Sequence, residues 1–254
     1  MVLAFDIGNT HMFLGGFSGK KILFTELIST NRSSTALEYM SLLQTTLKVH
    51  GLEKEPIDGA IISSVVPTVT ATVTATIERF FGITPIVVGP GVKSGLKIRI
   101  DNPAQLGSDL VVCAVAGIKE YPVPQINIYM GTATTISLID SSKTFLGTTI
   151  SAGMGVASEA LSDRTSQLPC VALETPKKVV GTNTVDSMRS GVVFYTASAI
   201  DGMIERIEDE YGEPCTVVVT GRYAPRILPH CKHKLIHDPD LILKGLMEVY
   251  AKNT

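Results

Sequence analysis

The sequence predicts an α/β protein made of two similar lobes with a cleft between them. Apolar runs of strand length alternate with segments of helical periodicity along the whole chain. A short apolar strand that runs into a glycine turn occurs at Val2–Thr10 and again at Asn127–Thr135. No low-complexity linker separates the two halves. We therefore expect lobes at residues 1–103 and 104–254 that pack closely together.

Composition narrows the class of protein further. Of the 254 residues, 44% are hydrophobic and 18% are charged, which excludes intrinsic disorder and allows a substantial buried core. The 22 Lys and Arg residues face 24 Asp and Glu residues, so no positive surplus exists for a nucleic-acid partner. This balance also argues against a DNA-binding transcriptional factor.

The location of the protein is also constrained by the sequence. Mean hydropathy is +0.27, but the longest apolar runs have the length of strands, so we expect no membrane association. Asp6 lies where a signal peptide would need its apolar centre. The four cysteines are far apart and form no CxxC pair, which is typical of reduced thiols. We expect a cytoplasmic protein.

In the first half, local patterns predict a hairpin, a helix and two buried strands. Strands are expected at Val2–Phe5, Met12–Phe17, Lys21–Phe24, Gly59–Val66 and Thr84–Val88. Thr35 and Glu38 have the spacing of a capping box, and Gly51 is expected to end the helix that follows. The apolar positions of this helix are Leu37, Met40, Leu43 and Leu47.

The second half repeats this theme. Asn102 followed by Pro103 predicts an N-cap and the first position of a helix. Strands are expected at Asn127–Met130, Ile136–Ile139, Thr144–Leu146 and Thr216–Thr220. A long helix is expected at about Asp186–Tyr211, and a last helix from Pro239 onwards.

The two glycine turns are the candidate chemical sites. In the turn after Asp6, a glycine lets backbone N–H groups approach an anion, and the Asp6 carboxylate can hold a hydrated Mg²⁺. Taken alone, Asp6–Thr10 fits an ordinary β-turn at least as well. A second turn at Gly131–Thr135 favours phosphate binding, because two facing Gly/Thr hairpins can clamp a polyphosphate.

Ordered fragments along the chain resemble one enzyme family. They are DIGNT at Asp6–Thr10, SSVVP at Ser63–Pro67, the glycine run at Gly91–Leu96, NPAQLGSD at Asn102–Asp109, GTATT at Gly131–Thr135, TSQLP at Thr165–Pro169, GTNT at Gly181–Thr184 and SG at Ser190–Gly191. Together they resemble type III pantothenate kinases, of the superfamily of acetate and sugar kinases, Hsp70 and actin. The resemblance implies duplicated actin-like (ribonuclease H-like) lobes with a nucleotide cleft between them. It also implies a helix at the threonine-rich stretch Thr68–Thr76, although its residues are β-branched.

The resemblance also implies an activity and its partners. The family transfers the γ-phosphoryl group of ATP to the primary hydroxyl of pantothenate, the first step of coenzyme A synthesis. It implies Mg²⁺, a monovalent cation (K⁺ or NH₄⁺), and a homodimer with the pantothenate pocket near the dimer interface.

The resemblance also implies which residues form the site, through the positions of this sequence that match the family's motifs. The first ATP-phosphate loop would be Asp6, Ile7, Gly8, Asn9, Thr10, His11, Met12 and Phe13, and Thr132 would contact ATP from the second loop. The pantothenate side would comprise Ile100, Gly107, Ser108, Asp109, Leu110 and Thr184. Asp109 would be the general base, because a carboxylate can accept the hydroxyl proton as the oxygen attacks phosphorus. The structural alternative is an acid favoured by the helix dipole.

The chain departs from the family pattern around the site. Leu110 stands where the family has arginine, and Tyr129 stands where it has the aspartate that binds the monovalent cation. Ile100 replaces an aromatic residue that lines the pantothenate pocket. The segments Gly147–Gly153 and Thr220–Arg222 also differ from the family pattern.

Two hypotheses account for these departures. In the first, the chain is a working kinase in which Arg222, Arg164 or Lys93 supplies the lost charge. In the second, it is a paralogue with little activity alone, which acts as a binding or regulatory subunit and pairs with an active homologue. The residues His230, Cys231, His233 and His237 resemble a metal-binding cluster, but their spacing favours an exposed polar connection.

Overall fold

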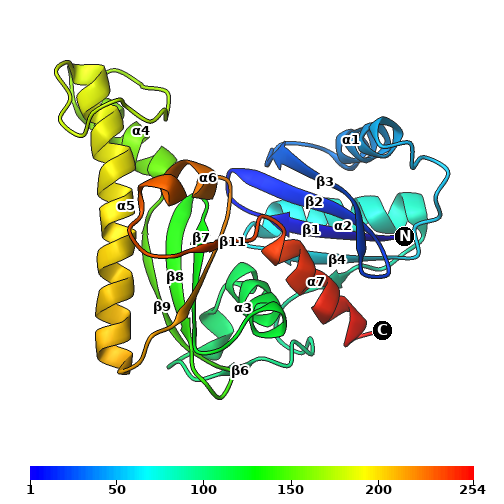
Figure 1. The fold of residues 1–254 in the computed structure, drawn as a ribbon. Helices are drawn as coiled ribbons and strands as arrows, with labels where there is room; N and C mark the ends of the chain where they lie inside the picture. The colour runs from blue at the N-terminus through cyan, green and yellow to red at the C-terminus, as the bar shows by residue number, and fades with distance from the viewer. The chain divides into compact units, whose positions relative to one another are not determined.

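A computed structural model describes all 254 residues, which form two compact units (Figure 1). The first unit comprises Met1–Leu96, Asp101–Ala116 and Asp240–Thr254, and the second comprises Lys97–Ile100 and Gly117–Pro239. Each predicted lobe is one continuous segment of the chain, whereas each compact unit is made of two or three separate segments. The C-terminal residues therefore fold with the N-terminal ones, and the lobe boundary at residue 103 stays a prediction.

The first unit contains a five-stranded sheet. Its strands are β1 (Val2–Ile7), β2 (His11–Ser18), β3 (Lys21–Ser29), β4 (Gly59–Ser64) and β5 (Ile86–Val87). Their order is β3-β2-β1-β4-β5, with β1 antiparallel to β2 and parallel to β4. The register places Asp6 of β1 directly opposite Ser63 of β4. Because neighbouring strands share a side-chain period of two, both side chains point to the same face.

Helices cover the two faces of this sheet. They are α1 (Ala36–Val49), α2 (Pro67–Phe81), α7 (Leu241–Ala251) and the first part of α3 (Ser108–Glu120). Leu3, Phe5 and Ile7 point to the core shared with α1 and α2. Ala4 and Asp6 alternate with them, so they point to the opposite face, where α7 packs against β1 and β4. The sheet thus holds a carboxylate on the face away from its main core.

The second unit repeats the strand order of the first. Its strands are β6 (Lys97–Ile98), β7 (Gln125–Met130), β8 (Ala133–Ile139), β9 (Thr144–Ala152), β10 (Thr216–Thr220) and β11 (Ile236–His237). The order is β11-β10-β7-β8-β9-β6, with β7 antiparallel to β8 and parallel to β10. An antiparallel three-stranded meander followed by two parallel strands therefore occurs in both units, which confirms the prediction of duplicated α/β lobes.

The long helix α5 (Thr184–Tyr211) packs along the second sheet (Figure 1). Its buried residues Val193, Ala197 and Ile204 share a core with Ile126 and Ile128 of β7. The remaining helical segments of this unit are α4 (Met154–Arg164), α6 (Ala224–Ile227) and the 3-10 turn η2 (Leu228–His230). An asparagine N-cap, Asn183, begins α5, and Gly212 in the left-handed conformation ends it.

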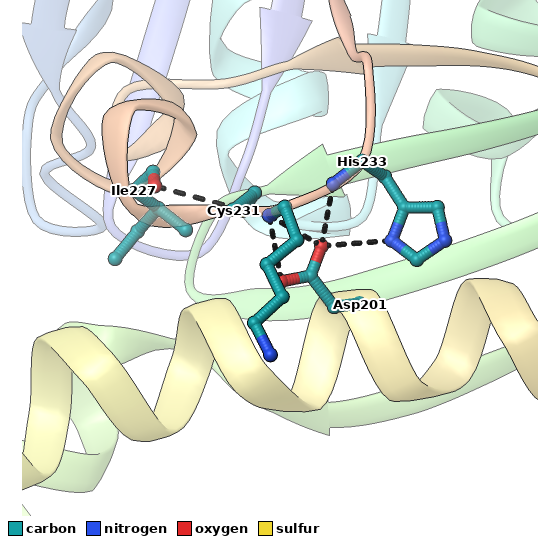
Figure 2. Close-up of polar contacts among 5 residues, drawn as sticks. Asp201, Ile227, Cys231 and His233 are labelled. Atoms are coloured by element: carbon teal, nitrogen blue, oxygen red, sulfur yellow. Dashed lines mark hydrogen bonds and ion pairs between the residues drawn. The ribbon is translucent and has the colours of Figure 1, made fainter.

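A buried carboxylate on α5 anchors the loop that follows η2 (Figure 2). The Asp201 carboxylate accepts hydrogen bonds from the backbone N–H groups of Lys232, at 2.9 and 3.0 Å, and of His233, at 3.1 Å. The Nδ1 atom of His233 lies 3.0 Å from Asp201 Oδ1. Burial raises the pKa of Asp201, but these hydrogen bonds outweigh burial and keep the pKa below its ordinary value.

Several predicted elements differ from those observed. The helix expected after Asn102 is instead the 3-10 turn η1 (Pro103–Gln105), and α3 begins at Ser108. Asn102 still acts as a cap, since its side chain accepts a hydrogen bond from the Ala104 N–H. Leu37 was expected on the apolar face of α1, but its first-turn position leaves it 64% exposed. The helix predicted at residues 68–76 is confirmed as part of α2.

Candidate functional site

The turn between β1 and β2 is a tight connection of Gly8, Asn9 and Thr10. The Gly8 N–H donates to the His11 carbonyl at 3.0 Å, and a Cβ at Gly8 would lie 2.9 Å from that oxygen. Glycine is therefore required here. The side chains of Asn9 and Thr10 are exposed, as an anion-binding turn requires.

Part of the predicted phosphate loop cannot contribute side chains. The side chains of Ile7 and Met12 are buried in the apolar core of the first unit. His11 and Phe13 are half-buried. Any contact of Ile7 and Met12 with a nucleotide would therefore have to come from the backbone.

The segment after β3 supports this turn from outside. The Thr30 N–H donates to the Thr10 carbonyl at 2.9 Å, and Thr30 Oγ1 donates to the Gly8 carbonyl at 2.7 Å. Arg32 Nη2 donates to Asn9 Oδ1 at 2.9 Å. A cationic side chain thus lies directly on the turn.

Behind the turn, Asp6 belongs to a buried hydroxyl network. Ser63 Oγ donates to Asp6 Oδ1 at 2.9 Å, and Ser108 Oγ lies 3.0 Å from Ser63 Oγ. The Ser64 N–H donates to Ser108 Oγ at 2.9 Å. This network connects the end of β1, the end of β4 and the first residue of α3. It therefore determines where α3 begins relative to Asp6.

Asp109, the second residue of α3, is the second acid in this region. A Cβ at Gly107 would lie 2.4 Å from Asp109 Oδ1, so residue 107 must be glycine for the Asp109 carboxylate to adopt this position. The Leu110 N–H donates to Asp109 Oδ1 at 3.0 Å. Burial raises the pKa of Asp109, and this backbone hydrogen bond offsets part of that increase.

The two carboxylates influence one another. The pKa of Asp6 is raised to about 7, mainly by burial and in addition by the negative charge of Asp109, against the hydrogen bond from Ser63, which lowers it. None of the ion pairs in the chain involves Asp6 or Asp109. The buried Asp6 and the half-buried Asp109, neither with an ion-pair partner, form a site that suits a divalent cation and a proton-accepting step.

The three side chains proposed to replace the family arginine do not all lie in the same unit as Leu110. Leu110 itself is buried, so its position offers no charge. Lys93 is exposed in the first unit and its backbone bonds to Asn253. Arg164 and Arg222 belong to the second unit, where the Arg222 guanidinium lies 4.6 Å from the Tyr223 ring centroid.

The turn between β7 and β8 corresponds to the first turn in position. The Gly131 N–H donates to the Ala133 carbonyl, and the Gly153 N–H donates to the Thr132 carbonyl, each at 3.0 Å. A Cβ at Gly153 would lie 2.4 Å from the carbonyl oxygens of Gly131 and Thr132. Gly221 has a φ of 101°, and a Cβ there would lie 2.6 Å from the Met130 carbonyl oxygen. Three glycine-containing segments therefore meet at one end of the second sheet.

Tyr129 lies beside this second turn. A Cβ at Gly131 would lie 3.1–3.2 Å from atoms of the Tyr129 phenol ring, so the ring covers the glycine. A neutral phenol is a poor ligand for a monovalent cation, for which a carboxylate would be expected. The donor set at this position therefore does not fit the cation that the resemblance implies.

The predicted site residues are divided between the two units. Asp6–Phe13 and Gly107–Leu110 lie in the first unit, and within it Asp6, Ser108 and Asp109 are brought together. The remaining ones, Ile100, Tyr129, Thr132 and Thr184, lie in the second unit. Thr184 is exposed at the first position of α5.

The histidine and cysteine residues near the end of the chain do not form a metal site. No group of three or more His, Cys, Asp or Glu side chains is placed to hold a metal ion. His233 instead contacts Asp201, and the Cys231 thiol donates to the Ile227 carbonyl at 3.6 Å (Figure 2). Burial raises the pKa of Cys231 to about 12, with a further contribution from the Asp201 charge, so the thiol is unreactive.

Two features were not identified from the sequence. Arg32 lies 23 residues from Asn9, and Ser63 lies 45 residues from Ser108. The predicted β2–β3 hairpin could have shown that the residues after β3 return to the first turn, because the register pairs His11 with Ser29. No local pattern indicates the contact between Ser63 and Ser108.

The duplicated sheets define a protein of the actin-like fold class. Solved structures with this fold include component A of (R)-2-hydroxyglutaryl-CoA dehydratase from Acidaminococcus fermentans, with a TM-score of 0.56, 13% identity and coverage of 98% of this chain and 96% of that one. The inorganic polyphosphate/ATP-glucomannokinase from Arthrobacter sp. strain KM has a TM-score of 0.50, 12% identity and coverage of 99% and 97%. At these identities the likeness concerns the fold alone.

Sequence comparison defines the family. The type III pantothenate kinase family matches residues 2–206. The type III pantothenate kinase of Halalkalibacterium halodurans is 38% identical over 253 residues, which cover 100% of both chains. That of Exiguobacterium sp. strain AT1b is 40% identical and covers 100% of this chain and 99% of its own. The chain belongs to the type III pantothenate kinase family.

Proposed function

We propose that this protein transfers the γ-phosphoryl group of ATP to the primary hydroxyl of pantothenate and forms 4′-phosphopantothenate, the first step of coenzyme A biosynthesis. The observation that carries this proposal is the placement of Asp109 beside Asp6 at the end of the first strand, in a chain that belongs to the family over its full length. The second hypothesis, a paralogue without activity of its own, is not favoured. Relatives that match the whole chain at 38–40% identity are named as the kinase.

In the proposed mechanism Asp109 is the general base. Its carboxylate accepts the proton of the pantothenate hydroxyl as that oxygen attacks the γ-phosphorus and ADP leaves. Desolvation favours this role, because it raises the pKa of Asp109 towards the pH at which the enzyme works. Gly107, Ser108, Leu110, Ile100 and Thr184 are proposed to surround pantothenate.

The nucleotide is proposed to bind through the two glycine turns. Backbone N–H groups of Gly8–Phe13 and the Thr132 side chain would hold the phosphates. These contacts need little net charge, which agrees with the nearly neutral composition.

Mg²⁺ fits the residues present. The Asp6 carboxylate is buried and uses one oxygen for Ser63, which leaves the other for a cation or its water shell. A divalent ion there would neutralise the charge that burial disfavours and would supply positive charge to stabilise the ATP phosphates. Tyr129 does not fit K⁺ or NH₄⁺, so no step is assigned to a monovalent cation.

The oligomeric state and the cellular location are proposed from the family. We propose a homodimer; an assembly with an active homologue is the weaker alternative. No helix of the chain has both the length and the apolar character needed to cross a membrane. A cytoplasmic location is proposed, since the substrates of this reaction occur there.

The test is a kinase assay on the purified chain. ADP release is coupled to NADH oxidation with MgATP and pantothenate, and the phosphorylated product is identified by mass spectrometry. We expect turnover that requires pantothenate and that Asp109→Asn reduces by about 10²-fold or more. Absence of product at every salt composition would show that the chain is not an independent kinase.

A further inference from the structure

Arg32 is a cationic residue at the first glycine turn that the family motifs did not indicate. It lies three residues beyond the end of β3, and Arg32 Nη2 donates to Asn9 Oδ1 at 2.9 Å. Two bonds from Thr30, to the carbonyls of Gly8 and Thr10, hold the same segment against the turn. The backbone that carries Arg32 is therefore held at the turn, which limits the positions of the guanidinium.

The guanidinium has most of its hydrogen-bonding capacity unused. An arginine side chain has five N–H donors, and the bond to Asn9 occupies one of them. Arg32 takes part in none of the ion pairs of the chain, and its side chain is exposed. The positive charge is therefore available to an anion at the turn.

The two acids behind this turn, Asp6 and Asp109, have no cationic side chain bonded to them. Leu110 is buried beside Asp109, and neither Asp6 nor Asp109 forms an ion pair. A polyphosphate that approaches these two acids is repelled unless a cation compensates. A planar guanidinium suits this task, because it binds phosphate oxygens through two parallel N–H groups.

We propose that Arg32 binds the terminal phosphates of ATP at the Gly8–Thr10 turn and supplies the positive charge that Leu110 does not provide. This inference rests on the proposed function, because it takes ATP as the ligand of that turn. In the nucleotide-free protein, the bond to Asn9 holds the guanidinium at the turn. On binding, the free N–H groups donate to phosphate oxygens.

The experiment compares Arg32→Gln and Arg32→Lys with the wild type. Arg79→Gln is the matched control, because Arg79 is another exposed arginine of the first unit, stacked on Phe80 of α2. Dissociation constants for MgATP and MgADP are measured by calorimetry at several NaCl concentrations, and KM values for ATP and pantothenate are measured in the coupled assay. Thermal melts verify that each variant is folded.

We expect Arg32→Gln to weaken MgATP binding by about 10-fold and to raise KM for ATP, with little change in KM for pantothenate. Arg32→Lys keeps the charge and should recover part of the affinity. The dependence of MgATP affinity on salt should become weaker in Arg32→Gln but not in Arg79→Gln, because a lost phosphate contact removes a screened charge interaction.

A merely structural role for Arg32 predicts a different result. If the arginine only supports Asn9, the salt dependence stays as in the wild type and Arg32→Lys gives no recovery, which overturns the inference. Unchanged MgATP affinity in a folded Arg32→Gln also overturns it and leaves the proposed kinase activity intact. Failure of the wild type to bind MgATP would refute the proposed function itself.

Discussion

The carboxylate of Asp6 is buried in the first unit, and the charge of the half-buried Asp109 contributes to a pKa of about 7 at Asp6. Burial is the larger cause of that increase. In the nucleotide-free protein, ionisation of Asp6 therefore costs free energy. Asp6 lies where we propose that the phosphates and the metal bind. Groups with strongly shifted pKa values are common in functional sites, where they lower the stability of the folded protein.

Asp6→Asn should stabilise the nucleotide-free protein at high pH. The pKa of Asp6 is higher in the folded chain than the value of 3.8 for an exposed aspartate, so the folded state binds the extra proton. Stability therefore falls as pH rises from about 4 to about 7. A shift to about 7 corresponds to a cost on the order of 4 kcal/mol once the group is ionised. We expect Asp6→Asn to melt several degrees higher than the wild type at pH 8, without added metal or nucleotide.

The pH dependence is the control for this prediction. At pH 5 the wild-type Asp6 is protonated and already neutral, so the two proteins should melt at similar temperatures. The same variant should lose kinase activity at both pH values, because it lacks the metal-binding carboxylate. A melting difference that is equal at pH 5 and pH 8 would show that ionisation of Asp6 is not its cause.

The rate of the reaction should decrease in acid at a higher pH than for an ordinary aspartate. Asp109 must be ionised to accept a proton, and burial raises its pKa. We expect kcat/KM for pantothenate, measured at saturating MgATP, to fall as pH decreases, and to do so at a higher pH than an aspartate of ordinary pKa would cause. Asp109→Glu keeps the acid but moves the carboxylate, and should retain more activity than Asp109→Asn. A flat profile with an active Asp109→Asn would exclude this residue as the base.

Local patterns in the sequence predicted much of the fold. The capping box at Thr35 and Glu38 forms with both of its hydrogen bonds, and the strand at Thr216–Thr220 has the predicted bounds. These features depend on residues a few positions apart, whose spacing is visible in the chain. The turn after Asp6 was identified for the same reason.

Contacts between distant segments were not predicted. The sequence does not reveal that Ser108 bonds to Ser63, because this contact depends on how α3 packs against the end of β4. It also did not show that α3 begins at Ser108, since Asn102 and Pro103 satisfy the pattern of a helix start and form a 3-10 turn instead. The placement of Arg32 on Asn9 likewise required the three-dimensional hairpin.

The Asp201 anchor should contribute measurably to stability. Its carboxylate accepts bonds from the N–H groups of Lys232 and His233, and an asparagine would leave some of these donors without an acceptor. We expect Asp201→Asn to lower the free energy of unfolding by about 2 kcal/mol at pH 7, measured by urea denaturation. Asp209→Asn, an exposed position of the same helix, should change it by less than about 0.5 kcal/mol.

The sign of the pH effect at Asp201 is opposite to that at Asp6. The pKa of Asp201 is lower in the folded state than in the unfolded state, so its contribution is present above the unfolded pKa and is lost as pH falls through the folded pKa. The difference between wild type and Asp201→Asn should therefore narrow in strong acid. An equal difference at pH 7 and in strong acid would indicate that the charge of Asp201 does not matter.

Tyr129 should make the enzyme insensitive to the identity of the monovalent cation. Its ring covers Gly131 and offers no carboxylate, so the wild type should turn over at similar rates in K⁺, NH₄⁺ and Na⁺ salts of equal ionic strength. Tyr129→Asp restores the acid of the family pattern and should create a several-fold preference for K⁺ or NH₄⁺. Tyr129→Phe keeps the ring and should remain insensitive. Strong activation of the wild type by K⁺ would show that other oxygen atoms hold the cation and that the phenol does not replace it.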